Sequence, residues 1–198
     1  KKKRLTENHS KEVLSRITAS SNFEDLVNSD LIIEAVFEDL NLKKGLYKEI
    51  EPHLKPSAVL ASNTSTLPIT ELSESLKDIE RFIGIHFFSP VEKMNLVEII
   101  KGKNSGDKSL AVALDFTRKI KKTPIVVNDA RGFFANRCII PYINEGLQMV
   151  SEGIKPSLIE NCAKHIGMPL GPLQLIDELS LNLAVSVANE TKDAMGTD

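Results

Sequence analysis

Short apolar runs alternate with segments of helical periodicity along the first two thirds of the chain. A helix is predicted over residues 38–54, "EDLNLKKGLYKEIEPHL", because Leu42, Leu46 and Ile50 recur at helical spacing. Two further helices are predicted for "ITELSESL", with Thr70 as its N-cap, and for "KSLAVALDFTRKIKK". Strands that alternate with helices, and are too continuously apolar for a one-sided sheet, predict a mostly parallel sheet covered on both faces, the doubly wound α/β class. The predicted strands are "LIIEAVF", "AVLASNTS", "FIGIHFF", "NLVEIIK" and "PIVVN".

The periodicity becomes purely helical after Asn128. Gly and Pro separate the helical segments, which are 132–153, 156–167 and 172–192. We therefore predict a domain boundary between Asn128 and Arg131, with a partial α/β domain over residues 1–128 and a helical domain over residues 129–198. The chain begins without Met and ends within a helical pattern, which indicates a fragment of a longer protein.

The charge and composition of the chain limit the kinds of molecule that it is expected to bind. The 198 residues carry a formal net charge of −2, so there is no electrostatic case for nucleic acid or for an anionic membrane. No apolar run approaches the roughly 18 residues of a spanning helix. The basic start is not followed by the apolar stretch of a signal peptide. A function that acts on small molecules remains open.

The cysteines and histidines give no sign of a disulfide or metal framework. Cys138 and Cys162 lie in predicted helices without CxxC spacing, so we expect reduced residues with a packing role. The four histidines lack metal-ligand spacing, and we predict no metal site.

His86 and Glu98 are polar residues inside two predicted strands. Glu98 lies between Val97 and Ile99, where burial of an unpaired carboxylate costs several kcal/mol. The intervening "FFSPVEKMN" predicts a turn that returns the second strand beside the first, so the two side chains can meet. The pair is then either a general base with an orienting carboxylate or a structural ion pair, and the residues alone leave both interpretations open.

Asn136 lies on an apolar helical stripe, which predicts a buried amide with a hydrogen-bond partner. That partner is either a substrate oxygen or a neighbouring backbone group, and the second is the commoner case. The apolar members of the stripe are Phe133, Ile140, Ile143, Leu147 and Val150.

Two further groups follow predicted strands. Asn63 and Ser65 stand at the carboxyl end of a strand, where open α/β sheets bind ligands, although such residues are also common in loops and caps. Glu38 follows another predicted strand, and Lys43 lies about one helical turn farther on. For these two charges, solvation at the surface is the default interpretation.

Five motifs in order give the chain a resemblance to a known family. They are "DLIIEAVFEDL", "LASNTSTLPI", "GIHFFSPVEKMNLVEII", "DARGFFANR" and "GMPLGPLQLIDEL". Together they resemble the L-3-hydroxyacyl-CoA dehydrogenase family over essentially the whole chain, and most of all the dehydrogenase part of the multifunctional fatty-acid β-oxidation enzymes. The resemblance implies a Rossmann-type NAD domain followed by a helical domain that commonly dimerises. It also implies oxidation of a 3-hydroxyacyl-CoA to a 3-ketoacyl-CoA with hydride transfer to NAD.

The resemblance also assigns roles to individual residues. His86 matches the catalytic base and Glu98 its partner carboxylate, while Ser65 and Asn136 match residues that position the substrate oxygens, with Ser65 also near the nicotinamide. Lys3 matches a basic residue that meets CoA. The implied cofactor contacts are Ala35, Glu38, Lys43, Ser65 and Ser89.

Two departures from the family pattern change these expectations. Ser89 stands where the single-function enzymes have a cofactor-contacting Asn. The sequence also lacks the GxGxxG turn that supplies the pyrophosphate site, so we expect this chain by itself to bind NAD poorly.

Three functional hypotheses follow. The first is a dehydrogenase within a larger multifunctional enzyme. The alternatives are a free-standing short-chain 3-hydroxybutyryl-CoA dehydrogenase and a catalytically silent dimerisation module. The resemblance implies a homodimer through the helical domain, a possible thiolase subunit as partner, and a bacterial cytoplasm or mitochondrial matrix as location.

Overall fold

The computed structural model describes residues 6–178 of the chain. The strands are β1 (Leu31–Glu34), β2 (Val59–Ser62), β3 (Phe82–Phe87), β4 (Leu96–Lys101) and β5 (Thr123–Asn128). The α-helices are α1 (Glu7–Leu14), α2 (Leu40–Ile50), α3 (Ile69–Ser73), α4 (Asp107–Lys119), α5 (Ala135–Ser151), α6 (Pro156–His165) and α7 (Pro172–Glu178). Short 3₁₀ turns cover Phe23–Asn28, Glu51–His53 and Ile79–Arg81.

The five strands form one sheet in the order β1-β2-β3-β4-β5. Neighbouring strands are parallel except for β3 and β4, which are antiparallel. The predicted return of β4 alongside β3 is confirmed, and its register pairs His86 with Glu98. This register matters for the site, because residues directly opposite each other in an antiparallel pair point to the same face of the sheet.

Both faces of the sheet are covered, as the doubly wound class requires. Because alternate residues of a strand face opposite sides, β1, β2, β3 and β4 each contribute to two apolar clusters. On one face, Tyr47 of α2 and Leu72 of α3 pack in a cluster with Phe82. On the other face, Ala113 of α4 packs with Ile83 and neighbouring strand residues. The predicted α/β fold class is therefore confirmed.

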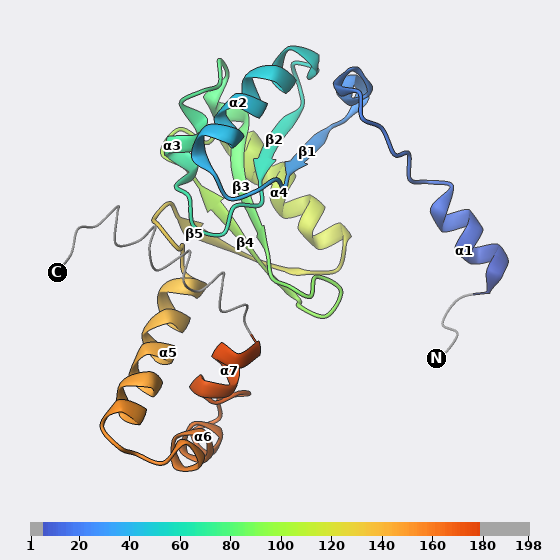
Figure 1. The fold of residues 1–198 in the computed structure, drawn as a ribbon. Coiled ribbons are helices and arrows are strands. Elements are labelled where there is room, and N and C mark those ends of the chain that lie inside the picture. The colour runs from blue at the N-terminus through green and yellow to red at the C-terminus, as the bar shows by residue number, and fades with distance from the viewer. Residues whose placement is uncertain (1–5, 179–198) are drawn as a thin grey trace.

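The helical part lies beyond the carboxyl end of β5 and stands apart from the sheet (Figure 1). Helix α5 packs against α7, and Tyr142 donates a hydrogen bond of 2.8 Å to the carbonyl oxygen of Leu170. A Cβ added at Gly146 would lie 2.5 Å from Cγ of Pro172, so this close helix packing requires glycine. Helix α1 is set away from the sheet and buries none of its residues (Figure 1).

Several expectations for the helices were wrong in detail. Cys138 and Cys162 are exposed free thiols rather than packing residues, because they face away from the contacts of α5 and α6. The apolar stripe of α5 is only partly covered: Ile143 is buried, whereas Leu147 and Val150 are exposed. The final predicted helix, 172–192, is described only as far as residue 178.

The predicted N-cap of α3 was also wrong. Pro68 holds the N-cap position and makes no side-chain capping bond, while Thr70 lies within the helix. The first N–H groups of the helix are instead satisfied by Asp129, whose carboxylate accepts from Ile69 N at 2.8 Å and from Thr70 N at 2.7 Å. The cap thus comes from the segment that follows β5, some 60 residues later in the chain.

Candidate active site

His86 and Glu98 meet in the middle of the sheet's antiparallel pair. Nδ1 of His86 lies 2.8 Å from Oε2 of Glu98, and both residues are buried. A carboxylate can only accept a hydrogen bond, so the ring hydrogen is on Nδ1 and the lone pair is on Nε2. The rings of Phe88 and Phe133 pack near the imidazole, with centroid distances of 4.6 and 5.9 Å. The predicted contact is confirmed, and it leaves Nε2 as a base.

The second oxygen of Glu98 holds the start of the helical part. Oε1 accepts hydrogen bonds from the backbone N–H groups of Phe134 at 3.0 Å and Ala135 at 2.8 Å, where α5 begins. The helix has no side-chain cap from its own N-cap residue, so Glu98 takes that place. The turn before it is tight, because Gly132 and Phe133 both have positive φ, at 72° and 50°.

The environment of Glu98 keeps this carboxylate ionised. Burial raises the pKa of Glu98, but hydrogen bonds from His86, Ala135 and Phe134 and the electrostatic attraction of the His86 ring outweigh it, so the pKa lies below the ordinary value. An ionised carboxylate at Nδ1 fixes the tautomer of His86. It also stabilises the positive charge that the ring acquires when Nε2 takes a proton.

Ser65 and Asn136 lie beside each other although 71 residues separate them in the chain. Nδ2 of Asn136, in the first turn of α5, donates a hydrogen bond of 3.1 Å to the carbonyl oxygen of Ser65, in the loop after β2. Asn136 is half-buried, not fully buried as its position on the stripe predicted. The backbone partner is the commoner of the two alternatives, and the amide still has a second N–H and a carbonyl oxygen for a ligand.

Asn63 joins this loop to the strand that carries His86. Its Oδ1 accepts from the backbone N–H of Phe87 at 2.8 Å, one residue after the histidine. The loop after β2, the end of β3 and the start of α5 therefore meet at one place.

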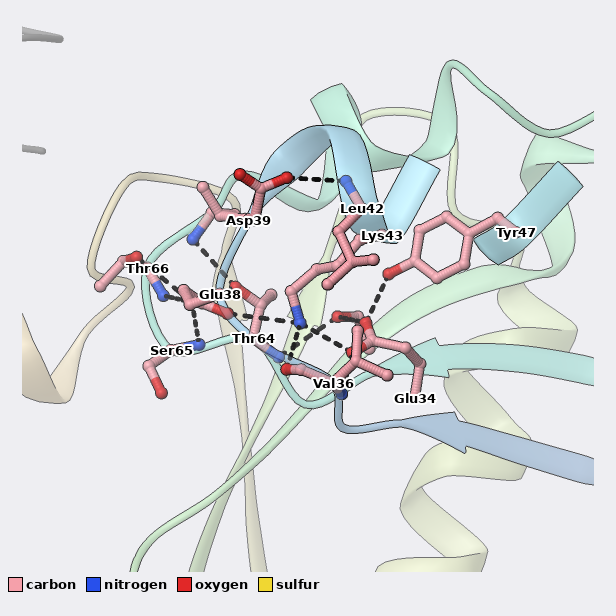
Figure 2. Close-up of polar contacts among 12 residues, drawn as sticks. Glu34, Val36, Glu38, Asp39, Leu42, Lys43, Tyr47, Thr64, Ser65 and Thr66 are labelled. Carbon is pink, nitrogen blue, oxygen red and sulfur yellow. Dashed lines mark hydrogen bonds and ion pairs between the residues drawn. The ribbon is translucent and has the colours of Figure 1, made fainter. Parts of the chain in front are cut away.

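Glu38 organises the same loop from the other side (Figure 2). Its Oε1 accepts from Thr64 Oγ1 at 2.6 Å, from Ser65 N at 2.7 Å and from Thr66 N at 2.9 Å. Burial raises the pKa of Glu38, but the Thr64 hydroxyl, the Lys43 ammonium and the two backbone N–H groups together bring it below the ordinary value. Glu38 is therefore a carboxylate around which the Ser65 loop is folded.

Lys43 is not the solvated charge that the default interpretation expected. Only 1% of its surface is exposed, and Nζ lies 2.7 Å from Oε1 of Glu34 and 3.4 Å from Oε2 of Glu38. The reason is that the last residue of β1 is itself a buried carboxylate, Glu34, which needs a cation.

Sequence reasoning missed Glu34, although the signal was present. Glu34 stands between Ile33 and Ala35 in an apolar run, as Glu98 stands between Val97 and Ile99. The same argument about a buried carboxylate would have singled it out.

The remaining predicted residues take no part in the contacts described above. Ala35 and Ser89 are exposed on the loops after β1 and β3. Ser89 precedes Pro90 in a cis peptide bond. Lys3 lies outside the described residues.

The carboxyl ends of β1 and β2 fit the edge where a doubly wound sheet binds a nucleotide. The loops after these strands bring Ala35, Glu38 and Ser65 to that edge, with the Ser65 loop held by hydrogen bonds on both sides. The polar groups on these loops are of the kind that orients a nicotinamide cofactor, and Asn63 joins the Ser65 loop to the strand that carries His86. Among residues 6–178, no cluster of three or more His, Cys, Asp or Glu side chains is placed to hold a metal ion. None of the helices in the described part has the length and apolar character to span a bilayer.

Comparison with known families matches both parts of the chain. A family model described as "3-hydroxyacyl-CoA dehydrogenase, NAD binding domain" matches residues 1–130, and one described as "3-hydroxyacyl-CoA dehydrogenase, C-terminal domain" matches residues 132–198. A curated relative, the fatty acid oxidation complex subunit alpha of Idiomarina loihiensis, is 41% identical over 172 residues. The match covers 87% of this chain but only 24% of that relative.

Solved structures give the same result. The (S)-3-hydroxybutyryl-CoA dehydrogenase PaaH1 of Ralstonia eutropha superposes with a TM-score of 0.91 at 35% identity, over 99% of this chain and 70% of that one. The dehydrogenase part of multifunctional enzyme 1 from C. elegans superposes with a TM-score of 0.64 at 29% identity, over 99% of this chain and 45% of that one.

Proposed function

The chain belongs to the 3-hydroxyacyl-CoA dehydrogenase family, and we propose that it oxidises (S)-3-hydroxyacyl-CoA to 3-ketoacyl-CoA as part of a larger fatty-acid β-oxidation enzyme. The observation that carries the proposal is the buried His86–Glu98 pair, with Nδ1 and Oε2 2.8 Å apart, beside the Ser65–Asn136 contact. A silent dimerisation module has no use for a base that is oriented in this way.

The proposed chemistry assigns one task to each of four side chains. NAD, when bound, accepts the hydride that leaves C3 of the substrate. Nε2 of His86 takes the proton of the 3-hydroxyl group, and Glu98 stabilises the charged ring that results. The hydroxyl of Ser65 and the amide of Asn136 orient the 3-oxygen and the thioester oxygen. Because Asn136 is also bonded to the Ser65 backbone, the two groups are positioned together.

Two further parts of the proposal concern organisation. We place the domain boundary between Asn128 and Arg131, so that residues 1–128 form the partial NAD-binding domain and residues 129–198 the helical domain. Exposed apolar residues on α5, such as Leu147 and Val150, support a homodimer through the helical domain. A thiolase subunit is the proposed partner of the whole enzyme, in line with the name of the relative as a complex subunit.

The second candidate is a free-standing short-chain 3-hydroxybutyryl-CoA dehydrogenase. The observation that favours it is the superposition on the Ralstonia eutropha enzyme, whose name states that substrate. Turnover by the full-length protein on 3-hydroxyacyl-CoA thioesters of increasing chain length separates the two candidates. Activity confined to the four-carbon substrate selects the second.

The catalytic assignment is tested by replacing His86 in the full-length protein. His86→Ala should lower the rate of NADH formation by about 10²–10⁴-fold, the usual contribution of a positioned acid or base, while substrate affinity changes less. His165→Ala, at an exposed position in α6, is the matched control and should retain activity. Near wild-type turnover in His86→Ala would return this histidine to a structural role.

A further inference from the structure

The β3–β4 loop, residues 88–95, begins two residues after the proposed base. The ring of Phe88 packs against the imidazole of His86, with the two centroids 4.6 Å apart, and Ser89 is the next residue of the loop. The resemblance implies a cofactor contact for Ser89. The placement of this loop therefore bears on both the base and the proposed NAD site.

The loop is exposed from Ser89 onward, and its own hydrogen bonds form a single turn. The backbone N–H groups of Lys93 and Met94 both donate to the carbonyl oxygen of Pro90, at 2.9 and 3.1 Å. The later carbonyl groups of such a turn have no partner within it, as at the end of a helix, and they carry partial negative charge. A cation from another segment can therefore bind them.

Lys122 supplies that cation. Its Nζ donates to the carbonyl oxygen of Val91 at 2.5 Å and to that of Met94 at 2.6 Å. In the part of the chain that the structure describes, these are the only hydrogen bonds that join residues 89–94 to another segment. Hydrogen bonds from an ammonium group are stronger than those from a neutral donor. One side chain thus anchors the loop at two points.

The end of α4 places Lys122 beside this loop. The N–H groups of Lys121 and Lys122 donate back to the carbonyl oxygens of Arg118 and Thr117, at 2.9 and 3.1 Å, which is the pattern of a Schellman motif. The motif needs a residue with positive φ after the helix, and Lys121 has a φ of 61°. The chain then leaves the helix next to the β3–β4 loop and enters β5 (Figure 1).

We propose that Lys122 is a positioning residue of the dehydrogenase site: its ammonium group holds the β3–β4 loop, and through the loop it places Phe88 and Ser89. It acts through this loop and not by contact with cofactor or substrate. Ser65 and Asn136 belong to other segments and are bonded to each other, so the placement of the acyl-CoA does not depend on Lys122. The inference rests on the proposed function for its kinetic readout, but not for its structural readout.

Three variants separate this role from the effects of charge and size. Lys122→Met keeps the aliphatic stem and removes the donors, whereas Lys122→Arg keeps a charged donor for the two carbonyl groups. Lys121→Met is the matched control, because it removes the same charge from the neighbouring residue. Lys121 is exposed, and within residues 6–178 its side chain makes no hydrogen bond or ion pair.

Steady-state kinetics of the full-length protein give the first readout. We expect Lys122→Met to raise KM for NAD and lower kcat, so that kcat/KM for NAD falls about 10-fold, since misplacement by about 1 Å can cost up to about 100-fold. KM for the 3-hydroxyacyl-CoA should not change. Lys122→Arg and Lys121→Met should keep the wild-type constants. Wild-type kinetics in Lys122→Met, or an equal rise in KM for both substrates, would overturn the proposal.

Amide hydrogen exchange of the full-length protein tests the positioning without any activity. In Lys122→Met, a peptide that covers residues 88–95 should take up deuterium faster, while one that covers α4 should not change. Unchanged uptake over residues 88–95, or faster uptake in α4 alone, would overturn the proposal. If Lys122→Met fails to fold, the shorter and uncharged Lys122→Gln carries the same two readouts. If the wild-type protein lacks dehydrogenase activity, the proposed function fails, and the exchange result still decides the role of Lys122.

Discussion

At the scale of single residues, Glu98 is shared between two elements. One oxygen holds the ring of His86 and the other holds the backbone at the start of α5. A carboxylate can do both, because both of its oxygens accept. A structural ion pair and an orienting carboxylate are therefore not exclusive alternatives in this fold, and loss of the charge should affect both turnover and stability.

Glu98→Gln should separate these contributions. The amide has only one accepting oxygen, so if that oxygen keeps the α5 N–H groups, the NH₂ group faces Nδ1 and places the ring hydrogen on Nε2, where it blocks the base. We expect a large fall in turnover and a loss of about 1.5–3 kcal/mol in the free energy of unfolding, the usual value of a hydrogen bond to a charged group. Urea unfolding and NADH formation check the two effects. Glu92→Gln, at an exposed position before β4, is the control, and wild-type turnover in Glu98→Gln would refute the assigned tautomer.

At acidic pH, the free energy of unfolding should depend on the protonation of Glu38 and Glu98. Both have a pKa below the ordinary value of 4.5 in the folded protein. The unfolded chain therefore binds more protons than the folded one in this range, and stability rises with pH. The contribution of these carboxylates is complete above about pH 4.5 and is lost as the pH falls through their lower folded values. The difference in urea midpoint between wild type and Glu38→Gln should shrink below pH 4.5, and a constant difference would contradict the prediction.

At the scale of elements, the strands were predictable because continuous apolar runs are a local signal. The pairing of His86 with Glu98 followed from the turn between β3 and β4. The partners of Glu34 did not follow in the same way: Lys43 and Tyr47 lie 9 and 13 residues away, and which face of α2 turns inward is decided by packing on the sheet. A single sequence likewise gives no sign that Asp129 caps α3.

Asp129 ties α3 to the segment that leads into α5. Replacing it with Ala leaves two backbone N–H groups at the helix start without their acceptor, so we expect a loss of about 1–2 kcal/mol in the free energy of unfolding, typical of a lost cap. Chemical denaturation measures this loss. Asp115→Ala, on the exposed side of α4, should change stability much less, because its pair with Arg118 is long, at 3.9 Å, and solvent-exposed. If Asp129→Ala lowered the free energy of unfolding as little as Asp115→Ala does, the cap would make no measurable contribution to stability.

At the scale of the whole molecule, the residues of the site come from both parts of the chain. His86, Glu98 and Ser65 belong to the sheet and its loops, whereas Asn136 belongs to α5. Glu98 and Ser65 each bond across to the start of α5. The placement of the helical part relative to the sheet is therefore also the placement of Asn136 relative to His86.

NAD binding shows whether the 198-residue chain contains a complete cofactor site. Pyrophosphate binding in a Rossmann domain needs backbone N–H groups at a glycine turn and helix N-terminus, and the 198 residues contain no GxGxxG sequence. In the proposed site, Ser65 and the loop around Glu38 meet the nicotinamide end of NAD, which supplies orientation but few phosphate contacts. We expect calorimetry to detect little NAD binding to the 198-residue chain. A longer polypeptide that carries a glycine turn of the family type ahead of residue 1 should bind NAD clearly. Equal affinity of the two would mean that the loops after β1 and β2 hold the cofactor without that turn, and the assignment of the phosphate site would have to change.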